Sequence, residues 1–165
     1  MESSTDTISK PQDKKTPIQP NSNQSSTGPI DRGDKIAREI AEKDVQDWLD
    51  FKKVSESRRE EKQDAIDTLV GAICEGVLVL RDGFKWEQTL KFPLENEITT
   101  RVLTYRPRIN TKELKQYTKG IKTGEGDDRV AAYVAALTKQ PRELILNLDT
   151  EDKSVADNIA LFFIG

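Results

Sequence analysis

The sequence predicts an α+β fold, in which a small antiparallel β-meander is followed by a cluster of about four short helices. Residues 76–105 alternate in hydrophobicity around an Asp-Gly turn, and the stretch after them repeats apolar residues at helical spacing. Residues 1–33 hold almost no large apolar side chains. We therefore expect a disordered arm over residues 1–33, a charged amphipathic helical stalk over 34–75 and an α+β domain over 76–165.

The overall composition is polar. Of the 165 residues, 35% are hydrophobic and 33% are charged, and the formal net charge is -3. This is too polar for one compact domain over the whole length, so part of the chain should lie outside any core. No run of about 18 apolar residues is present, so no membrane-spanning helix is predicted. Residues 1–10 lack the apolar segment of a secretory signal, which favours a cytoplasmic protein.

The residue inventory restricts the chemistry that the chain could perform. The sequence has no histidine, which excludes Ser-His and Cys-His nucleophile pairs, and the single cysteine, Cys74, is flanked by apolar residues. Residues 124–126 lack the lysine-serine pair of a phosphate-binding loop. Residues 149–152 lack the glycine and the distal glutamate of a calcium loop. We expect no enzyme, and no catalytic, cofactor-binding or metal site.

The arm and the stalk differ in their pattern. The arm contains four of the seven prolines among polar residues, so it cannot bury enough surface to offset the entropy of ordering. The stalk begins with Asp34 as a predicted N-cap. An apolar stripe then follows, which comprises Ile36, Ile40, Trp48, Phe51 and Val54.

A second stripe resumes after a polar stretch over residues 55–64, and it comprises Ile66, Leu69, Val70 and Ile73. Either one long helix or two helices joined through a solvated middle fits this pattern. Trp48 and Phe51 would then contact a partner helix or pack back onto the domain.

Three antiparallel strands are expected in residues 76–105. Asp82-Gly83 forms the first turn, and the next strand places Phe84, Trp86, Leu90 and Phe92 on one face. A third alternating run covers residues 98–105, and Pro107 ends it because proline cannot donate to the strand ladder.

The helices that follow are indicated by their end signals. Asn110 and Glu113 have capping-box spacing, and Gly120 marks a C-terminal stop. Asp127 and Asp128 open a second helix, and Pro141 suits the first turn of a third. Asp149 or Thr150 caps the last helix, whose apolar face comprises Val155, Ile159, Phe162 and Phe163.

One basic run interleaves cations with aromatic rings. It comprises Arg101, Arg106, Arg108, Lys112, Lys115, Lys119 and Lys122, with Tyr105 and Tyr117 between them. This combination is typical of single-stranded nucleic-acid binding, where charge holds phosphate and rings stack on bases. Because the chain is acidic overall, a solvated or protein-docking face is favoured over nucleic acid.

Residues 76–165 resemble the phage tail assembly chaperones, small proteins encoded before the tape measure protein of long-tailed phages. The resemblance rests on an order of strands and turns: a Leu-Lys-Phe-Pro-Leu strand, its partner, a Tyr-Arg-Pro turn and a Lys-Glu-Leu helix start. An Ala-Ala-Leu-Thr segment with Pro141 and a Leu-Asp pair then precede the last helix. These motifs occupy residues 90–94, 98–103, 105–107, 112–114, 135–144 and 148–152.

The resemblance implies a non-enzymatic assembly factor of the host cytoplasm, without a cofactor. Such a protein binds the tape measure protein, keeps it soluble and helps to recruit the tail-tube protein, and self-association along the partner is expected. The resemblance has no counterpart for residues 1–70.

Candidate partner-binding residues follow from the last helix face and the basic run. They are Val155, Ile159, Phe162, Phe163, Ile164, Arg106, Arg108 and Tyr117. For the apolar members, closure of the domain core is the alternative. The alternative functions are a nucleic-acid-binding accessory protein that uses the Arg101–Lys122 face, and a structural tail completion subunit.

Overall fold

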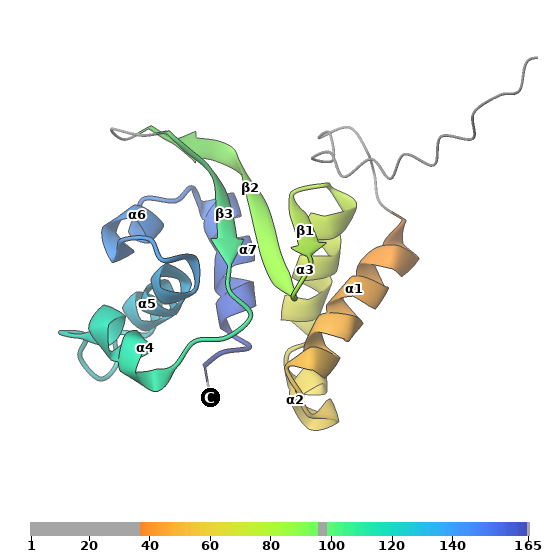
Figure 1. Ribbon diagram of the computed structural model, residues 1–165, viewed down its shortest axis with the longest axis horizontal. Helices are drawn as coiled ribbons and strands as arrows, with labels where there is room; N and C mark the ends of the chain where they lie inside the picture. Colours follow the sequence, from red (N-terminus) through yellow and green to blue (C-terminus); the bar gives the residue numbers. More distant parts are fainter. Residues whose placement is uncertain (1–36, 96–98, 165) are drawn as a thin grey trace, which may run out of the picture.

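The computed structural model describes residues 37–95 and 99–164. The predicted arm and the predicted N-cap Asp34 lie outside the described residues. Along the chain the elements are α1 (Arg38–Phe51), α2 (Glu56–Glu61), α3 (Gln63–Cys74), β1 (Leu78–Arg81), β2 (Lys85–Leu94), β3 (Thr100–Tyr105), α4 (Thr111–Thr118), α5 (Gly126–Thr138), α6 (Arg142–Leu146) and α7 (Thr150–Ala160) (Figure 1). The predicted α+β class and its antiparallel meander are confirmed.

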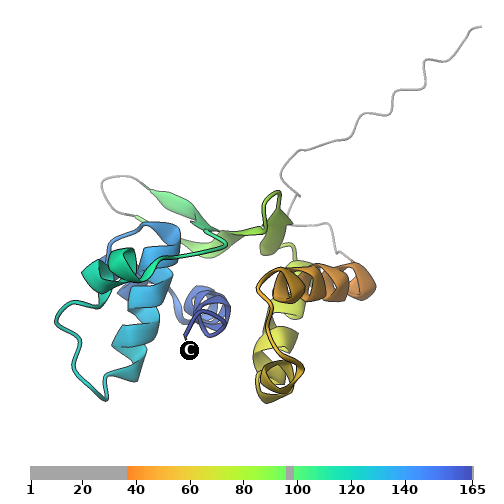
Figure 2. The same ribbon diagram turned by 60° about the horizontal axis from the view of Figure 1, so that its bottom comes forward.

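The sheet has the order β1-β2-β3 and one buried face. Cross-strand partners such as Gln88 and Leu103 point toward the helices, which gather on one side of the sheet in Figure 2. The buried side chains of this face include Leu78, Trp86, Gln88, Leu90, Leu103 and Tyr105. The residues between them, such as Glu87, Thr89, Val102 and Thr104, remain at least partly exposed, as the two-residue period of a strand requires.

The predicted face of β2 is wrong at Phe92, whose side chain is 52% exposed. The pairing with β3 shifts between Thr89 and Leu94, and such an irregularity turns the following side chains away from the face that they would otherwise share. Phe84 lies in the turn before β2 with a φ of +57°, so it too departs from the expected strand.

Residues 38–74 form three helices, α1, α2 and α3, instead of one long helix. The chain turns after α1, where Lys53 adopts a φ of +56°, and α1 then packs against α3. The polar stretch makes α2 and the start of α3, and α2 contains no buried residue. Of the two alternatives, the structure shows helices joined through a solvated middle.

Trp48 packs back onto the sheet and the last helix. Its ring centroid lies 5.5 Å from Trp86 on β2 and 5.5 Å from Phe162 after α7. The segment predicted as a stalk therefore shares one hydrophobic core with the α+β domain. The predicted stripe is wrong at Ile40, which is 56% exposed, because the buried face of α1 is formed by Ala41, Val45, Trp48 and Leu49.

Two predicted helix caps are confirmed, whereas Pro141, expected in the first turn of a helix, is the residue before α6. The Asn110 side chain accepts a hydrogen bond from the Glu113 amide at 2.8 Å, and Asp149 accepts one from the Glu151 amide at 2.9 Å. Helix α5 is buried from Ala131 to Thr138 and forms the centre of the C-terminal half. None of the described helices is long and apolar enough to cross a membrane.

Candidate functional site

The predicted apolar face of α7 is used to close the core. Val155, Ile159 and Phe162 are 8%, 0% and 3% exposed, so the structure leaves them unavailable to a partner. Packing of α7 against α3, α5 and β2 covers this face, because a domain of this size needs its apolar side chains inside. Only Phe163 and Ile164, which follow the helix, stay partly exposed.

The end of the described chain is also held from the side of α2. The Arg58 guanidinium donates hydrogen bonds to the backbone oxygens of Leu161, at 3.3 Å, and Ile164. These bonds satisfy carbonyl groups beyond the end of α7, which have no partner within the helix.

The two tyrosines of the basic run do not form a stacking surface. Tyr105 is 1% exposed and donates its hydroxyl hydrogen to Gln88 Oε1 at 2.6 Å. Burial away from water raises the pKa of the Tyr105 hydroxyl well above its ordinary value, with a further contribution from Asp157 and Asp152. Tyr117 lies on α4, where it is half-buried against the core.

Arg106 holds the loop after β3 in place. Its guanidinium lies 2.7 Å from Glu113 Oε1 and donates to the Ala136 carbonyl at 2.5 Å, while its amide donates to the Leu137 carbonyl at 3.0 Å. The hydrogen bond from Arg106 lowers the pKa of Glu113. The loop is thereby fixed against the end of α5, and Arg106 is occupied by these contacts.

Two depressions flank the fixed loop at Pro107-Arg108, and together we call them the cationic cleft. The first is lined by Phe51, Lys52, Lys53, Ile109 and Phe163, and the second by Lys85, Thr104, Arg106, Thr138 and Lys139; Pro107 and Arg108 belong to both. The cleft thus brings together three predicted partner-binding residues, Arg106, Arg108 and Phe163, from distant parts of the chain. Tyr117 is not among the lining residues.

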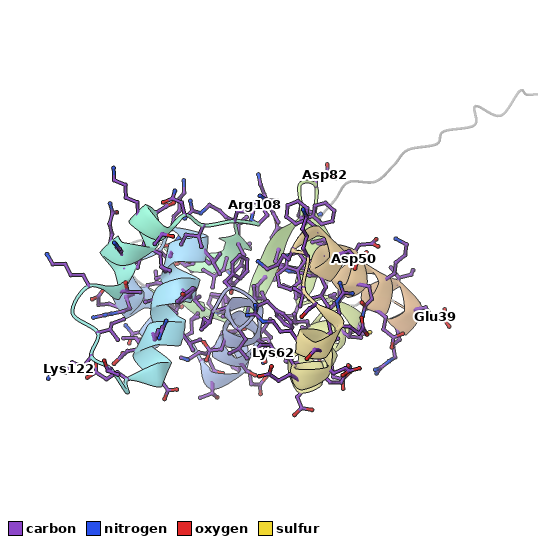
Figure 3. The ribbon with its side chains drawn as sticks, turned by 90° about the horizontal axis from the view of Figure 1, so that it is seen from below. Glu39, Asp50, Lys62, Asp82, Arg108 and Lys122 are labelled. Atoms are coloured by element: carbon purple, nitrogen blue, oxygen red, sulfur yellow. The ribbon has the colours of Figure 1, made fainter. Side chains whose placement is uncertain are left out.

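Five of the six cations that line the cationic cleft make no ion pair with a described residue; the sixth, Arg106, is paired with Glu113. Lys52, Lys53, Lys85, Arg108 and Lys139 contribute cations, and none of them makes an ion pair with a carboxylate in residues 37–95 and 99–164. Figure 3 shows Arg108 at the outer edge of the molecule, on the loop that follows β3. Arg108 is exposed, so its guanidinium is accessible to an anion.

Two aromatic rings, those of Phe51 and Phe163, line the first depression. The Arg108 guanidinium carbon lies 5.2 Å from the centroid of Phe51, and Phe51 stacks on Phe84 at 4.3 Å. The Lys52 ammonium lies 3.2 Å from the centroid of Phe163. Burial, followed by repulsion from Arg58 and Arg108, lowers the pKa of Lys52 to about 8.

The backbone near the cleft is strained at three residues. Lys53, Phe84 and Lys139 are the non-glycine residues with positive φ in the described part of the chain, at +56°, +57° and +56°. Lys53 lines the first depression, Lys139 lines the second, and Phe84 supports the Phe51 ring. A left-handed conformation costs a residue with a side chain roughly 1–2 kcal/mol, and such strain concentrates at functional sites.

The sequence reasoning missed Lys52, Lys53, Lys85 and Lys139 as site residues. They stand in three separate segments, at the end of α1, the start of β2 and the end of α5. None of them belongs to the basic run from Arg101 to Lys122, and only the adjacent pair Lys52-Lys53, after the predicted Trp48 stripe, gives a local signal in the sequence.

No group of three or more His, Cys, Asp or Glu side chains is placed to hold a metal ion within the ranges that the structure describes. The thiol of Cys74 is free and half-buried. The fold and the site together define an α+β protein with a cationic cleft, whose available chemistry is charge attraction and ring contact. Beyond this class, comparison with protein-family models, with curated proteins and with solved structures finds no match.

Proposed function

We propose that this protein is a non-enzymatic phage tail assembly chaperone, which binds the tape measure protein, keeps it soluble and helps to recruit tail-tube subunits. The observation that supports the proposal is the way in which the residues of the family resemblance are bonded to one another. Segments that lie far apart in the sequence meet through Asp152 and Arg106, so the resemblance describes one folded unit.

Asp152 joins the first and the last segments of the resemblance. Its carboxylate is 1% exposed and accepts hydrogen bonds from the amides of Lys91, at 2.8 Å, and Phe92, at 2.9 Å. The Gln88 side chain donates to the Asp152 backbone oxygen at 2.9 Å. The Leu-Lys-Phe-Pro strand is therefore held against the helix that follows the Leu-Asp pair.

Arg106 joins the two middle segments in the same way. Its bonds to Ala136 and Leu137 attach the Tyr-Arg-Pro turn to the Ala-Ala-Leu-Thr helix end, where the Thr138 hydroxyl donates to the Val134 carbonyl at 2.8 Å. These motif residues support the fold, and the proposal gives them no part in a reaction. A binding function is consistent with such a pattern, because a chaperone needs a stable surface and no reacting group.

The burial of the α7 face changes where the partner binds in this proposal. The contact surface lies outside the core, at the cationic cleft and the partly exposed Phe163 and Ile164 beside it. Charged side chains around a few aromatic contacts suit a reversible interaction with a long helical polypeptide. Several copies along one partner would account for the expected self-association.

Co-expression with the product of the next large reading frame, which the proposal requires to be a long helical protein, tests the proposal. We expect the soluble fraction of that protein to rise several-fold compared with expression alone. An unrelated acidic protein of similar size and a Trp48→Asp variant, whose core is disrupted, serve as controls and should give no rise. An equal soluble fraction with and without this chain would reject the chaperone function.

Purified phage particles separate the proposal from a structural tail completion subunit. Assembly chaperones are absent from finished particles, whereas a completion subunit stays in a fixed number of copies. Mass spectrometry of particles should therefore not detect this chain, and stoichiometric amounts of it would favour the structural alternative.

A further inference from the structure

We propose that the cationic cleft binds an acidic stretch of a partner polypeptide, with carboxylates seated on both sides of Arg108. The inference deepens the proposed function, on which it rests in taking the partner to be a polypeptide. It names the chemical character of the bound segment, which neither the fold nor the resemblance supplies.

The lining of the cleft brings cations from separate parts of the chain together and includes no carboxylate. Elsewhere, some cations, such as Arg38, Arg59, Lys91 and Lys153, lie within 4 Å of a carboxylate, at 2.5–3.0 Å for their closest pairs. Other exposed cations, such as Lys112 and Lys122, have no such partner within the described ranges, but they do not line the cleft. Of the six cations that line the cleft, all but Arg106 have no such partner among the described residues. Like charges gathered on one surface repel one another, and an incoming carboxylate relieves that repulsion.

The net negative charge of the chain restricts the attraction of an acidic peptide to the cleft. The formal net charge is -3, so the protein as a whole repels an acidic peptide. Attraction must therefore come from a restricted surface, and it will act only on a ligand that reaches the cleft. Arg108 lines both depressions, and its planar guanidinium can hold a carboxylate through two parallel hydrogen bonds.

The rings of the cleft favour a polypeptide over a nucleic acid. Base stacking needs an open ring face. Phe51 is covered by Phe84 on one side and by Arg108, while the Phe163 face is covered by Lys52. Tyr105, the remaining ring near the loop, is buried. The cleft therefore presents cations without the stacking surface that single-stranded nucleic acid requires.

The identity of the strained residues agrees with this assignment. Lys53 and Lys139 occupy left-handed positions at the ends of α1 and α5, where glycine is the favoured residue. Both side chains are exposed and make no ion pair within the described ranges. A role of its charge in binding an acidic ligand would explain why lysine, and not glycine, occupies each of these positions.

Fluorescence anisotropy with labelled peptides tests the proposal on the full-length protein. The probes are a glutamate-rich peptide of about fifteen residues, the same peptide with glutamine at every glutamate, and a single-stranded oligothymidine of equal length. We expect the acidic peptide to bind, the glutamine peptide not to bind, and the oligothymidine to bind at least about ten-fold more weakly than the acidic peptide.

Charge reversals locate the binding surface. Arg108→Glu should weaken binding of the acidic peptide at least about ten-fold, whereas Lys112→Glu, an equal charge change on exposed α4, should alter it less than about two-fold. Circular dichroism and the unfolding midpoint establish that each variant is folded. Lys85→Glu, at another exposed position of the cleft, should weaken binding in the same direction and provides a second test if Arg108→Glu does not fold.

Three results would overturn the proposal. One is the absence of binding to the acidic peptide, and another is an equal loss in the cleft variants and in Lys112→Glu. The third is tighter binding of oligothymidine that depends on Arg108, which would assign the cleft to nucleic acid. If the acidic peptide binds but co-expression does not raise the solubility of the partner, the cleft proposal stands and the chaperone function is rejected. If co-expression raises the solubility but the peptide does not bind, the chaperone function stands and the cleft proposal is rejected.

Discussion

Two groups of charged residues in this protein differ in what surrounds them. Around Asp152, the carboxylate is buried and bonded to two amides, and nearby Lys91 pairs with both Glu75, at 3.0 Å, and Glu151, at 3.1 Å. Around Arg108, six cations line two depressions, and five of them have no carboxylate partner in the described ranges. The first group stabilises the fold, whereas the positive charges of the second are available to a negatively charged ligand.

The largest expected effect is at Asp152. Replacing Asp152 by alanine leaves the Lys91 and Phe92 amides without their acceptor, and it should lower the free energy of unfolding by about 3 kcal/mol. Denaturant unfolding measures the change. The neighbouring exposed Glu151→Ala is the control, with an expected loss of about 0.5 kcal/mol or less. Equal losses for the two variants would contradict the contrast between the two groups.

The next effect concerns the buried hydroxyl of Tyr105. Tyr105→Phe leaves Gln88 Oε1 without its donor and should destabilise the protein by about 1–2 kcal/mol. Tyr133→Phe is a matched control, because Tyr133 is also buried but makes no hydroxyl hydrogen bond with the described residues. Thermal unfolding of both variants checks the difference. If the stability of Tyr105→Phe equals that of the wild type, the hydrogen bond between Tyr105 and Gln88 does not contribute to stability.

A smaller effect is expected from the titration of Lys52. Its pKa is lowered to about 8 in the folded protein, against 10.5 ordinarily, so the unfolded chain binds more protons between these values. The cost of keeping Lys52 charged is therefore present below pH 8 and disappears as the pH rises toward 10.5.

Relative to Lys52→Met, the wild-type protein should gain on the order of 1 kcal/mol of unfolding free energy between pH 7.5 and 10, after allowance for solvent screening. Denaturant unfolding at several pH values measures this difference. Lys53→Met, at an exposed neighbouring position, is the control and should run parallel to the wild type. If the difference in unfolding free energy between the wild type and Lys52→Met stays constant over this pH range, then burial and charge repulsion do not lower the pKa of Lys52.

The smallest effect separates stability from binding. Lys139→Gly relieves a left-handed φ of +56° and should raise the free energy of unfolding by up to about 1 kcal/mol. The same variant should bind the acidic peptide more weakly, because a cation of the cleft is lost. Unfolding and anisotropy measurements on one preparation check both, and tighter or unchanged binding would contradict a role for this lysine in the cleft.

The contrast between the two groups also explains what the sequence could predict. Local signals specified the Asn110 and Asp149 caps and the Asp82-Gly83 turn, because each depends on residues a few positions apart. The exposure of Phe92 was not predictable in this way, since it follows from the register of β2 against β3. The position of Trp48 was not predictable either, because contact with a partner helix and packing onto the domain differ only in tertiary structure.

The sequence by itself determined the α+β class, the order of the elements and most of their ends. These follow from the periodicity of apolar residues and from the backbone preferences of Gly, Pro, Asp and Asn. The tertiary structure alone decided that the α7 face closes the core and that Arg108 meets Lys52, Lys85 and Lys139. The burial of apolar surface depends on contacts between segments that are distant in the sequence. Charges from such segments come together only when these segments form the hydrophobic core.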